Sequence, residues 1–373
     1  MMKISYVAAF LDISGYSDAA RNNVCAISSV GIPVDAIPLS FENFKTDCGE
    51  LGKKIKPFII SNSDAPIQII HTIPPVFEKF ISLNKYNIGY TAWESSKLSN
   101  DWVRHINQLN EVWVPSEYNK NVFLDSGVSV PIYVMPHTFN IDILNKESSS
   151  KGISRPADFV FYSVFQFLPR KGPIQLLKAY LTEFSKNENV CLLLKTYLFD
   201  PTNPNEKEKI KDIIREIKEK LRLDSYPDIS LISSPLSRPQ MNALHKSCDC
   251  LISSHCSEGF GITLAEAMMA GNPVIATDYS GSMDFLSEDT GYPVKYQLTP
   301  VFDMPWPAYT GEQVWADINV MDLRSKMRYV FDNKNIARDK GLRGREFMIS
   351  NFSWEVIGNK MKKRLQEIYD NLQ

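Results

Sequence analysis

Residues 256–268 read Cys-Ser-Glu-Gly-Phe-Gly-Ile-Thr-Leu-Ala-Glu-Ala-Met, and this stretch decides the fold prediction. Two glycines flank Phe260, a helix is expected to start directly after them, and Glu258 and Glu266 stand on either side of that junction. Glycine lets the backbone approach a ligand closely, and a helix start presents unpaired N–H groups at the positive end of its dipole. Carboxylates accept hydrogen bonds from hydroxyl groups. The stretch therefore predicts a site for a ligand that carries both phosphates and hydroxyls, such as a nucleotide-sugar.

The same residues have a purely structural interpretation. Thr263 followed three positions later by Glu266 matches a capping box, and Gly271-Asn272-Pro273 is an ordinary helix stop. Glu266 taken alone is explained equally well as a cap. If Glu266 instead binds the ligand, a Glu266→Ala variant is expected to melt within a few degrees of the parent.

Taken together, Glu258-Gly-Phe-Gly, Glu266-Ala and the run Gly-Asn-Pro-Val-Ile-Ala at 271–276 resemble one family closely. They are similar to the E-x7-E signature of retaining glycosyltransferases of family 4 (glycosyltransferase group 1). The resemblance is strong over 160–285 and moderate over 87–140. It implies a GT-B fold, in which two Rossmann-like domains face each other across a cleft and the C-terminal helix crosses back to the first domain.

The pattern of the chain agrees with two α/β domains. The 373 residues are enough for about two domains, and continuous apolar runs such as Ile4–Phe10 are typical of strands buried in a parallel sheet. The polar run at 146–152 is interpreted as a linker. We expect an acceptor-binding domain at 1–150, a nucleotide-sugar domain at 151–352 and a C-terminal helix at 353–373. Further strands are expected at 34–37, 67–71, 88–91, 112–114, 132–135, 159–165, 190–194, 229–232, 249–253 and 274–277, and helices at 17–30, 75–82, 100–109, 117–125, 174–184, 207–221, 238–247, 321–333, 335–351 and 354–371.

The resemblance assigns donor-side roles residue by residue. Glu266 would hold the ribose hydroxyls, and Glu258 with nearby backbone amides would hold the sugar. Pro169-Arg170-Lys171-Gly172-Pro173 resembles the diphosphate-binding motif of the family, in which Arg170 and Lys171 would offset charge on the leaving group. The remaining donor-side candidates are Gly259, Phe260, Gly261, Ile262, Thr263, Ser280 and Gly281.

One position departs from the family pattern. An arginine usually precedes the motif lysine by five or six positions, whereas this chain has Phe165 and Gln166 there. Lys195, at the end of a predicted buried strand, is a candidate substitute, although a lysine at that place is often simply solvated.

The residues expected to bind the acceptor lie in the first domain. Gly15 follows the first strand, Glu94 follows another, and both Trp93 and Glu94 belong to a run that resembles a subset of family-4 enzymes with a Trp-Glu pair. Glu94 would bind the acceptor hydroxyl or act as its base. His137 would face the cleft, though a lone histidine is more often structural.

Other classes are disfavoured. A net charge of −2 gives no field for nucleic acid, and no G-x-G-x-x-G follows either first strand, which argues against an NAD-dependent dehydrogenase. The cysteines around 248–256 lack the paired spacing of a zinc site, and the absence of a D-x-D run fits catalysis without a metal or other cofactor. Scattered cysteines and the lack of a signal or membrane span suggest a cytoplasmic protein. The charged helix at 206–223 is interpreted as a solvated face, with peripheral membrane contact as the alternative.

Two rival functions stay open at this point. One is a nucleotide-sugar epimerase of GT-B fold, and the other is a non-catalytic glycosyltransferase-like partner subunit. A glycan or lipid-linked glycan is the expected acceptor. No motif identifies the nucleotide base of the donor, the sugar transferred, the linkage formed or the oligomeric state.

Overall fold

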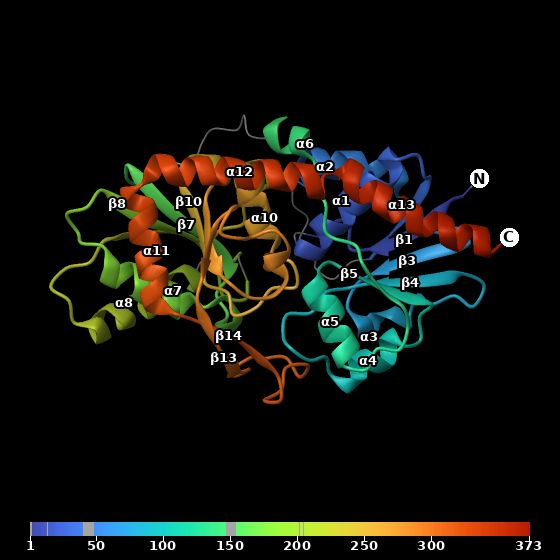
Figure 1. Ribbon diagram of the computed structural model, residues 1–373, viewed down its shortest axis with the longest axis horizontal. Coiled ribbons are helices and arrows are strands. Elements are labelled where there is room, and N and C mark those ends of the chain that lie inside the picture. Colours follow the sequence, from blue (N-terminus) through green and yellow to red (C-terminus); the bar gives the residue numbers. More distant parts are fainter. Residues whose placement is uncertain (1, 13, 40–47, 147–153, 201, 204) are drawn as a thin grey trace. The chain divides into compact units, whose positions relative to one another are not determined.

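The computed structural model describes residues 2–12, 14–39, 48–146, 154–200, 202–203 and 205–373 (Figure 1). The chain forms two compact units, Met1–Glu147 with Ile349–Gln373, and Ser148–Met348. Residues 147–152 of the predicted linker lie outside the described residues. None of the described helices is both long enough and apolar enough to cross a membrane.

The first unit contains a parallel sheet with strand order β2-β1-β3-β4-β5-β6. Apolar side chains on both faces bury these strands, as the continuous hydrophobic runs predict. The strands are β1 Ile4–Ala8, β2 Val34–Pro38, β3 Ile67–His71, β4 Tyr86–Tyr90, β5 Glu111–Val114 and β6 Ile132–Val134. The helices of this part are α1 Gly15–Ser29, α2 Gly49–Ile55, α3 Pro74–Phe77, α4 Asn100–Ile106, α5 Glu117–Asp125 and α6 Ile141–Lys146.

The C-terminal helix α13, Trp354–Asn371, belongs to the first unit and packs against α1. Its apolar face joins the core of this unit, while polar contacts fix its position. Trp354 Nε1 donates to Asn22 Oδ1 at 2.9 Å, and Arg364 Nη2 lies 2.6 Å from Oε2 of the fully buried Glu111. Helix α13 therefore completes the first unit although it comes from the other end of the chain.

The second unit repeats the architecture with strand order β12-β11-β10-β7-β8-β9, again parallel. An antiparallel hairpin of β13 and β14 follows this sheet. The strands are β7 Phe159–Gln166, β8 Val190–Tyr197, β9 Asp228–Ile232, β10 Cys250–Ser253, β11 Val274–Thr277, β12 Tyr292–Val294, β13 Tyr296–Pro300 and β14 Val314–Ile318. The helices are α7 Pro173–Glu183, α8 Asn205–Leu221, α9 Arg238–Ser247, α10 Ile262–Met269, α11 Val320–Asp332 and α12 Lys334–Phe352, of which the last continues into the first unit.

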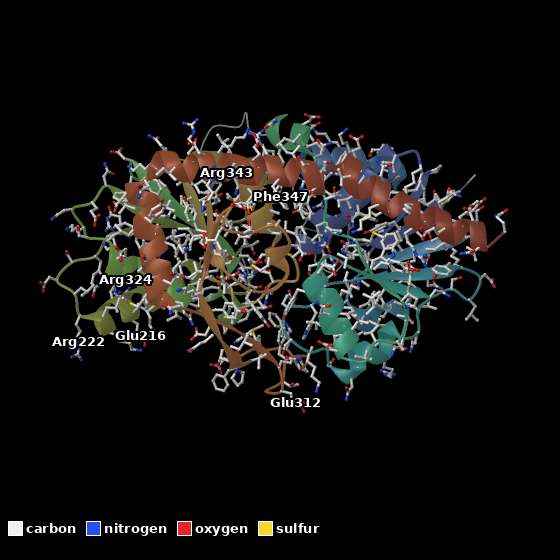
Figure 2. The ribbon with its side chains drawn as sticks, viewed as in Figure 1. Glu216, Arg222, Glu312, Arg324, Arg343 and Phe347 are labelled. Atoms are coloured by element: carbon white, nitrogen blue, oxygen red, sulfur yellow. The ribbon has the colours of Figure 1, made fainter. Side chains whose placement is uncertain are left out.

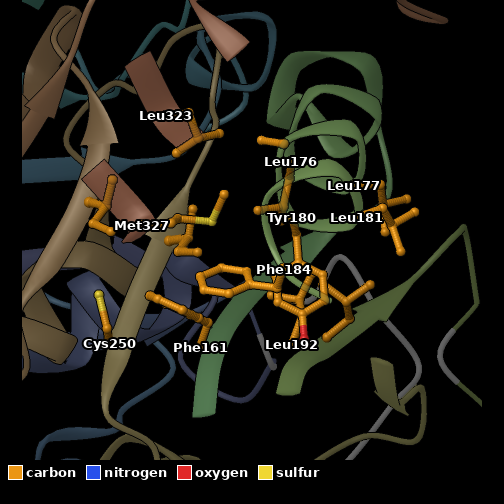
Figure 3. Close-up of a cluster of buried hydrophobic side chains, with 14 of the residues drawn as sticks. Phe161, Leu176, Leu177, Tyr180, Leu181, Phe184, Leu192, Cys250, Leu323 and Met327 are labelled. Carbon is orange, nitrogen blue, oxygen red and sulfur yellow. The ribbon is translucent and has the colours of Figure 1, made fainter. Parts of the chain in front are cut away.

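The core of the second unit lies where α7 and α11 pack together on the sheet (Figure 3). Phe161 on β7 and Leu192 on β8 contribute from the strands, Tyr180 and Phe184 from α7, and Met327 from α11. These side chains are almost fully excluded from solvent, so this face of the sheet is rigid. The polar residues of the predicted site therefore lie at the ends of the strands and not on this face of the sheet.

Most expected elements are confirmed within a few residues, and three expectations are wrong. Helix α10 begins at Ile262 with Gly261 as its N-cap, so Thr263 lies inside the helix and the predicted capping box with Glu266 does not form. Helix α1 begins at Gly15 because Ser14 caps it through Ser17 N, whereas the sequence placed Gly15 in a loop. Helix α3 ends at Phe77, well before residue 82.

Candidate donor-binding site

Polar loops of the second unit meet at the carboxyl ends of β7, β10 and β11. The chain builds β7, β8 and β9 in one direction and then returns to place β10 beside β7, so the strand order reverses between these two strands. Open α/β sheets bind ligands at such a switch point, outside the carboxyl ends of the strands. Most residues predicted to bind the donor come from the loops that follow these strands or from the start of α10, whereas Lys195 lies on β8.

The loop after β7 is locked onto the loop after β10. Pro169–Lys171 form a single 3-10 turn, and Gly172 adopts φ 59° before α7 begins. A Cβ on Gly172 would lie 2.1 Å from the carbonyl oxygen of Ser254, so only glycine fits here. Ser254 Oγ donates to the carbonyls of Lys171 at 3.0 Å and Gly172 at 2.8 Å. Cys256 N donates to Arg170 O at 2.6 Å.

These backbone contacts bring Glu258 against both cations of the predicted motif. Lys171 Nζ forms an ion pair and hydrogen bond with Glu258 Oε1, and Arg170 Nη1 lies 3.4 Å from Oε2. Arg170 Nη1 also donates to Ser257 O at 2.9 Å. Side-chain exposure is only 11% for Arg170, 19% for Lys171 and 12% for Glu258. The three charges thus form one shielded cluster beside the N-terminus of α7.

The cluster keeps Glu258 ionised. Burial alone would raise the pKa of Glu258, but the adjacent Lys171 and Arg170 outweigh burial and lower that pKa to about 2. At neutral pH the site therefore holds two positive charges and one negative charge. A phosphate that enters would meet cations whose present partner is a carboxylate, so it would compete with Glu258 for them.

Ser280 and Gly281, in the turn after β11, hold the Glu258 backbone. Glu258 N donates to Ser280 Oγ at 2.8 Å, and Gly281 N donates to Glu258 O at 2.9 Å. Ser280 has φ 73°, a left-handed conformation that costs a non-glycine residue about 1 kcal/mol or more. The structure thus places both predicted residues in contact with the Glu258 backbone.

The glycine-flanked segment forms the start of α10. Gly261 adopts φ 96° as the N-cap, and no side chain caps the helix, so backbone amides of Ile262 and Thr263 stand at its positive end. The Phe260 ring is buried and lies 5.0 Å from the Phe285 ring, centroid to centroid. Phe260 therefore anchors the segment through its side chain, and only its backbone is suited to contact a ligand.

Glu266 is paired with another helix. Arg238 Nη2 on α9 lies 2.5 Å from Glu266 Oε1, and His245 Nε2 lies 3.6 Å from Oε2. Burial would raise the pKa of Glu266, yet Arg238 and His245 lower it to about 2. His245 Nδ1 in turn lies 2.7 Å from Tyr162 OH. Glu266 is therefore part of a buried network, which predicts a larger loss of stability for Glu266→Ala than the few degrees expected from the sequence.

Lys195, the proposed substitute cation, lies near the carboxyl end of β8 and pairs in register with Val164 of β7. Its side chain is buried, and burial lowers its pKa to about 8. Its ammonium lies 5.6 Å from the centroid of the Tyr197 ring. Lys195 is therefore not the solvated lysine of the alternative interpretation. Its burial and lowered pKa favour a role at the carboxyl ends of the strands.

The acceptor-side candidates occupy the first unit. The Trp93 side chain is buried, contacts the Trp102 ring at 4.5 Å and donates from Nε1 to Lys97 O at 2.9 Å. Trp93 thus serves the packing of its own loop, next to the half-buried Glu94. His137 Nδ1 lies 2.9 Å from Tyr90 OH, and burial lowers the pKa of His137 to about 3, so the ring is neutral at neutral pH.

His71, which was not predicted from the sequence as a site residue, lies beside His137. His71 ends β3, and its ring stacks on that of His137 at 6.4 Å. Tyr6 OH lies 2.8 Å from His71 Nδ1, and burial lowers the pKa of His71 well below its ordinary value. The available signal was its place: a polar residue ending a strand next to β1, at the switch point of this sheet.

The described residues do not support a zinc site at the cysteines around 248–256. No group of three or more His, Cys, Asp or Glu side chains within them is arranged to hold a metal ion. Cys248, Cys250 and Cys256 are buried free thiols, and burial raises the pKa of Cys248 and of Cys256 to about 12. Thiolates, which bind zinc, are therefore disfavoured at these two positions.

Comparison with known proteins agrees with this architecture. Residues 145–296 match the family model described as glycosyl transferases group 1. No curated protein matches the sequence with significance. The fold is similar to that of several solved glycosyltransferase structures. Sucrose-phosphate synthase from Thermosynechococcus elongatus is 16% identical over 100% of this chain and 100% of that chain, with a TM-score of 0.71.

Two further structures carry nucleotide ligands. HepE of Anabaena, in complex with UDP-glucose, is 14% identical over 98% of this chain and 100% of that chain, with a TM-score of 0.64. TarM of S. aureus, in complex with UDP and alpha-GlcNAc-glycerol among other ligands, is 13% identical over 98% and 100%, with a TM-score of 0.65. At such identities the likeness shows the fold, which is GT-B.

Proposed function

We propose that the protein is a retaining glycosyltransferase that moves a hexosyl unit from a nucleoside-diphosphate sugar to a saccharide or lipid-linked glycan acceptor. The observation that carries this proposal is the cluster of Arg170, Lys171 and Glu258 at the switch point of the second sheet. The match of residues 145–296 to group 1 glycosyl transferases covers the whole cluster and supports the same reading.

The two cations are suited to the charge that develops during sugar transfer. As the bond between the sugar and the diphosphate breaks, negative charge grows on the leaving phosphate. Arg170 would bind a phosphate oxygen through its planar guanidinium, and Lys171 would follow as a mobile point charge. The N-terminus of α7 adds a positive dipole end at the same place. These residues would offset part of the charge on the leaving group, and the proposed reaction uses no metal or other cofactor.

Glu258 and Glu266 would then bind hydroxyls of the donor. Glu258 stays ionised because its pKa is lowered, so it accepts hydrogen bonds from sugar hydroxyls once phosphate occupies its cations. Glu266, held in place by Arg238, would accept from the ribose. Backbone amides of Gly259, Gly261 and Ile262 would complete the sugar contacts. In the first unit, Gly15, Glu94 and His137 would contribute the acceptor side.

A thermal-shift panel of UDP, GDP, TDP and their sugars tests the donor site. UDP is the first compound to try because HepE and TarM were solved with UDP or UDP-glucose. A ligand at 100 times its dissociation constant should stabilise the protein by ~2.7 kcal/mol. Lys171→Met should weaken binding at least tenfold, whereas Lys178→Met, an exposed lysine on α7, should leave binding unchanged. Equal affinity in both variants would refute the role of Lys171.

The rival functions are separated by incubation of a donor that binds. A transferase releases nucleotide in step with an added acceptor, and the product keeps the anomeric configuration of the donor. An isomerised sugar formed from donor alone would instead indicate an epimerase. Binding without turnover over a broad acceptor panel would indicate a non-catalytic subunit.

A further inference from the structure

The β13–β14 hairpin, with the connection at 301–313, has no role in the donor site described above, yet it is built onto that site. Tyr296 on β13 lies 5.1 Å, centroid to centroid, from the ring of Tyr279, the residue before Ser280. On the other strand, Ala316 N donates to Cys256 O at 2.9 Å. Each strand of the hairpin therefore contacts one of the two loops that hold Glu258.

A small buried cluster fixes the base of the connection to the same place. Cys256, Val301 and Trp315 pack together, with Met304 and Tyr309 half-buried against them. Cys256 N also donates to Arg170 O, so Cys256 links the hairpin directly to the loop that carries the cation pair. Movement of the hairpin relative to the donor loops would disrupt this cluster.

Beyond this base the connection displays large aromatic rings to solvent. Phe302 is 74% exposed and Trp306 is 44% exposed, and Leu298 on the adjoining strand is 56% exposed. Prolines at 300, 305 and 307 restrict the backbone, and Asp303, which lies between Phe302 and Trp306 in the sequence, adopts φ 59°. Large rings held out by a restricted and locally strained backbone are typical of a binding surface rather than of a plain connection.

The chemistry of the connection favours a saccharide over other occupants. Its only charged residues over 295–313 are Lys295, Asp303 and Glu312, of which Glu312 is labelled in Figure 2. The net negative charge opposes an anionic membrane surface. Two rings and one leucine are also far fewer than the roughly 20 residues per partner of a stable dimer interface. Sugar C–H faces pack on the electron-rich face of an aromatic ring, and carboxylates accept from sugar hydroxyls.

We propose that the exposed rings of Phe302 and Trp306 bind a saccharide unit of the acceptor, so that the second unit contributes an acceptor subsite beside its donor loops. The inference rests on the proposed glycosyltransferase function and adds a substrate contact to it. The rings hold the acceptor by stacking, and Asp303 accepts from its hydroxyls.

Fluorine NMR of the full chain labelled with 5-fluorotryptophan tests the subsite directly. The chain has six tryptophans, and the Trp306 signal is the one that Trp306→Phe removes. The probes are maltose, lactose and chitobiose, each titrated to about 100 mM so that millimolar affinity is detected. We expect a saturable shift of the Trp306 signal with at least one saccharide. Phe302→Ala should weaken this binding about fivefold, whereas Leu298→Ala, at another exposed apolar position, should not.

Three results would overturn the proposal. They are no Trp306 shift with any saccharide, a shift produced by phosphatidylglycerol vesicles instead, and a shift produced by raising the protein concentration alone. A parallel UDP-glucose titration of the same samples, followed by thermal shift, keeps the two proposals distinct. If the unsubstituted protein does not bind UDP-glucose, that result counts against the proposed function. The Trp306 signal reports on the saccharide subsite alone.

Discussion

Replacing Glu258 by Gln removes the charge between Lys171 and Arg170 while it preserves the shape of the side chain. The neighbouring cations lower the pKa of Glu258 from its ordinary 4.5 to about 2, which corresponds to about 3 kcal/mol of stabilisation at neutral pH. Because folding lowers this pKa, the stabilisation is complete above about pH 4.5 and is lost as the pH falls toward 2. By pH 3 roughly 2 kcal/mol of it should be gone.

Urea unfolding at pH 7, 5 and 3, followed by circular dichroism, measures this effect. From pH 7 to pH 3 the parent protein should lose about 2 kcal/mol more of its unfolding free energy than Glu258→Gln does. Other carboxylates, Glu266 included, are present in both proteins and cancel in the comparison. Glu219→Gln, at an exposed position on α8, should behave like the parent. If Glu258→Gln and the parent lose equal stability, the ion cluster does not exist in solution as described.

Three further perturbations have defined outcomes. Gly172→Ala should cost more than 1 kcal/mol of unfolding free energy and weaken UDP binding in calorimetry, whereas Gly311→Ala, with open space around it, should do neither. Glu266→Gln should cost about 3–5 kcal/mol, and Arg238→Gln added to it should recover part of this loss in a double-mutant cycle. Arg364→Ala should cost a similar amount in urea unfolding because it leaves the fully buried carboxylate of β5 without its guanidinium.

Sequence patterns were sufficient for the strands of the parallel sheets other than β12, because strands buried on both faces show as continuous apolar runs. Strand β3 and helices α5, α9 and α13 were predicted to the residue. The donor loops were also predictable, since glycines and charged residues at strand ends are local signals. The resemblance assigned Arg170, Lys171 and Glu258 to different parts of one donor, and the direct contact of Glu258 with both cations was found only in the structure.

Long-range partners were not predictable in this way. The capping box at Thr263 and Glu266 fits local rules, but tertiary contacts hold Glu266 to Arg238, and Gly261 begins the helix instead. The β13 and β14 strands were not predicted, because their pairing joins two five-residue segments across the connection at 301–313, which no short motif encodes. His71 was overlooked because its significance depends on the return of the chain to β1, which no short motif encodes.

The late arrival of α13 has a consequence for synthesis of the chain. Its residues supply part of the core of the first unit, yet the ribosome makes them only after the whole of the second unit. The apolar face of α1 that α13 covers therefore stays exposed to solvent while some two hundred residues are translated. At elongation rates of about 5–20 residues per second this exposure lasts roughly 10 to 40 seconds, and chaperones shield such surfaces. A truncation that removes only α13 should accordingly aggregate, even though every strand of both sheets is intact.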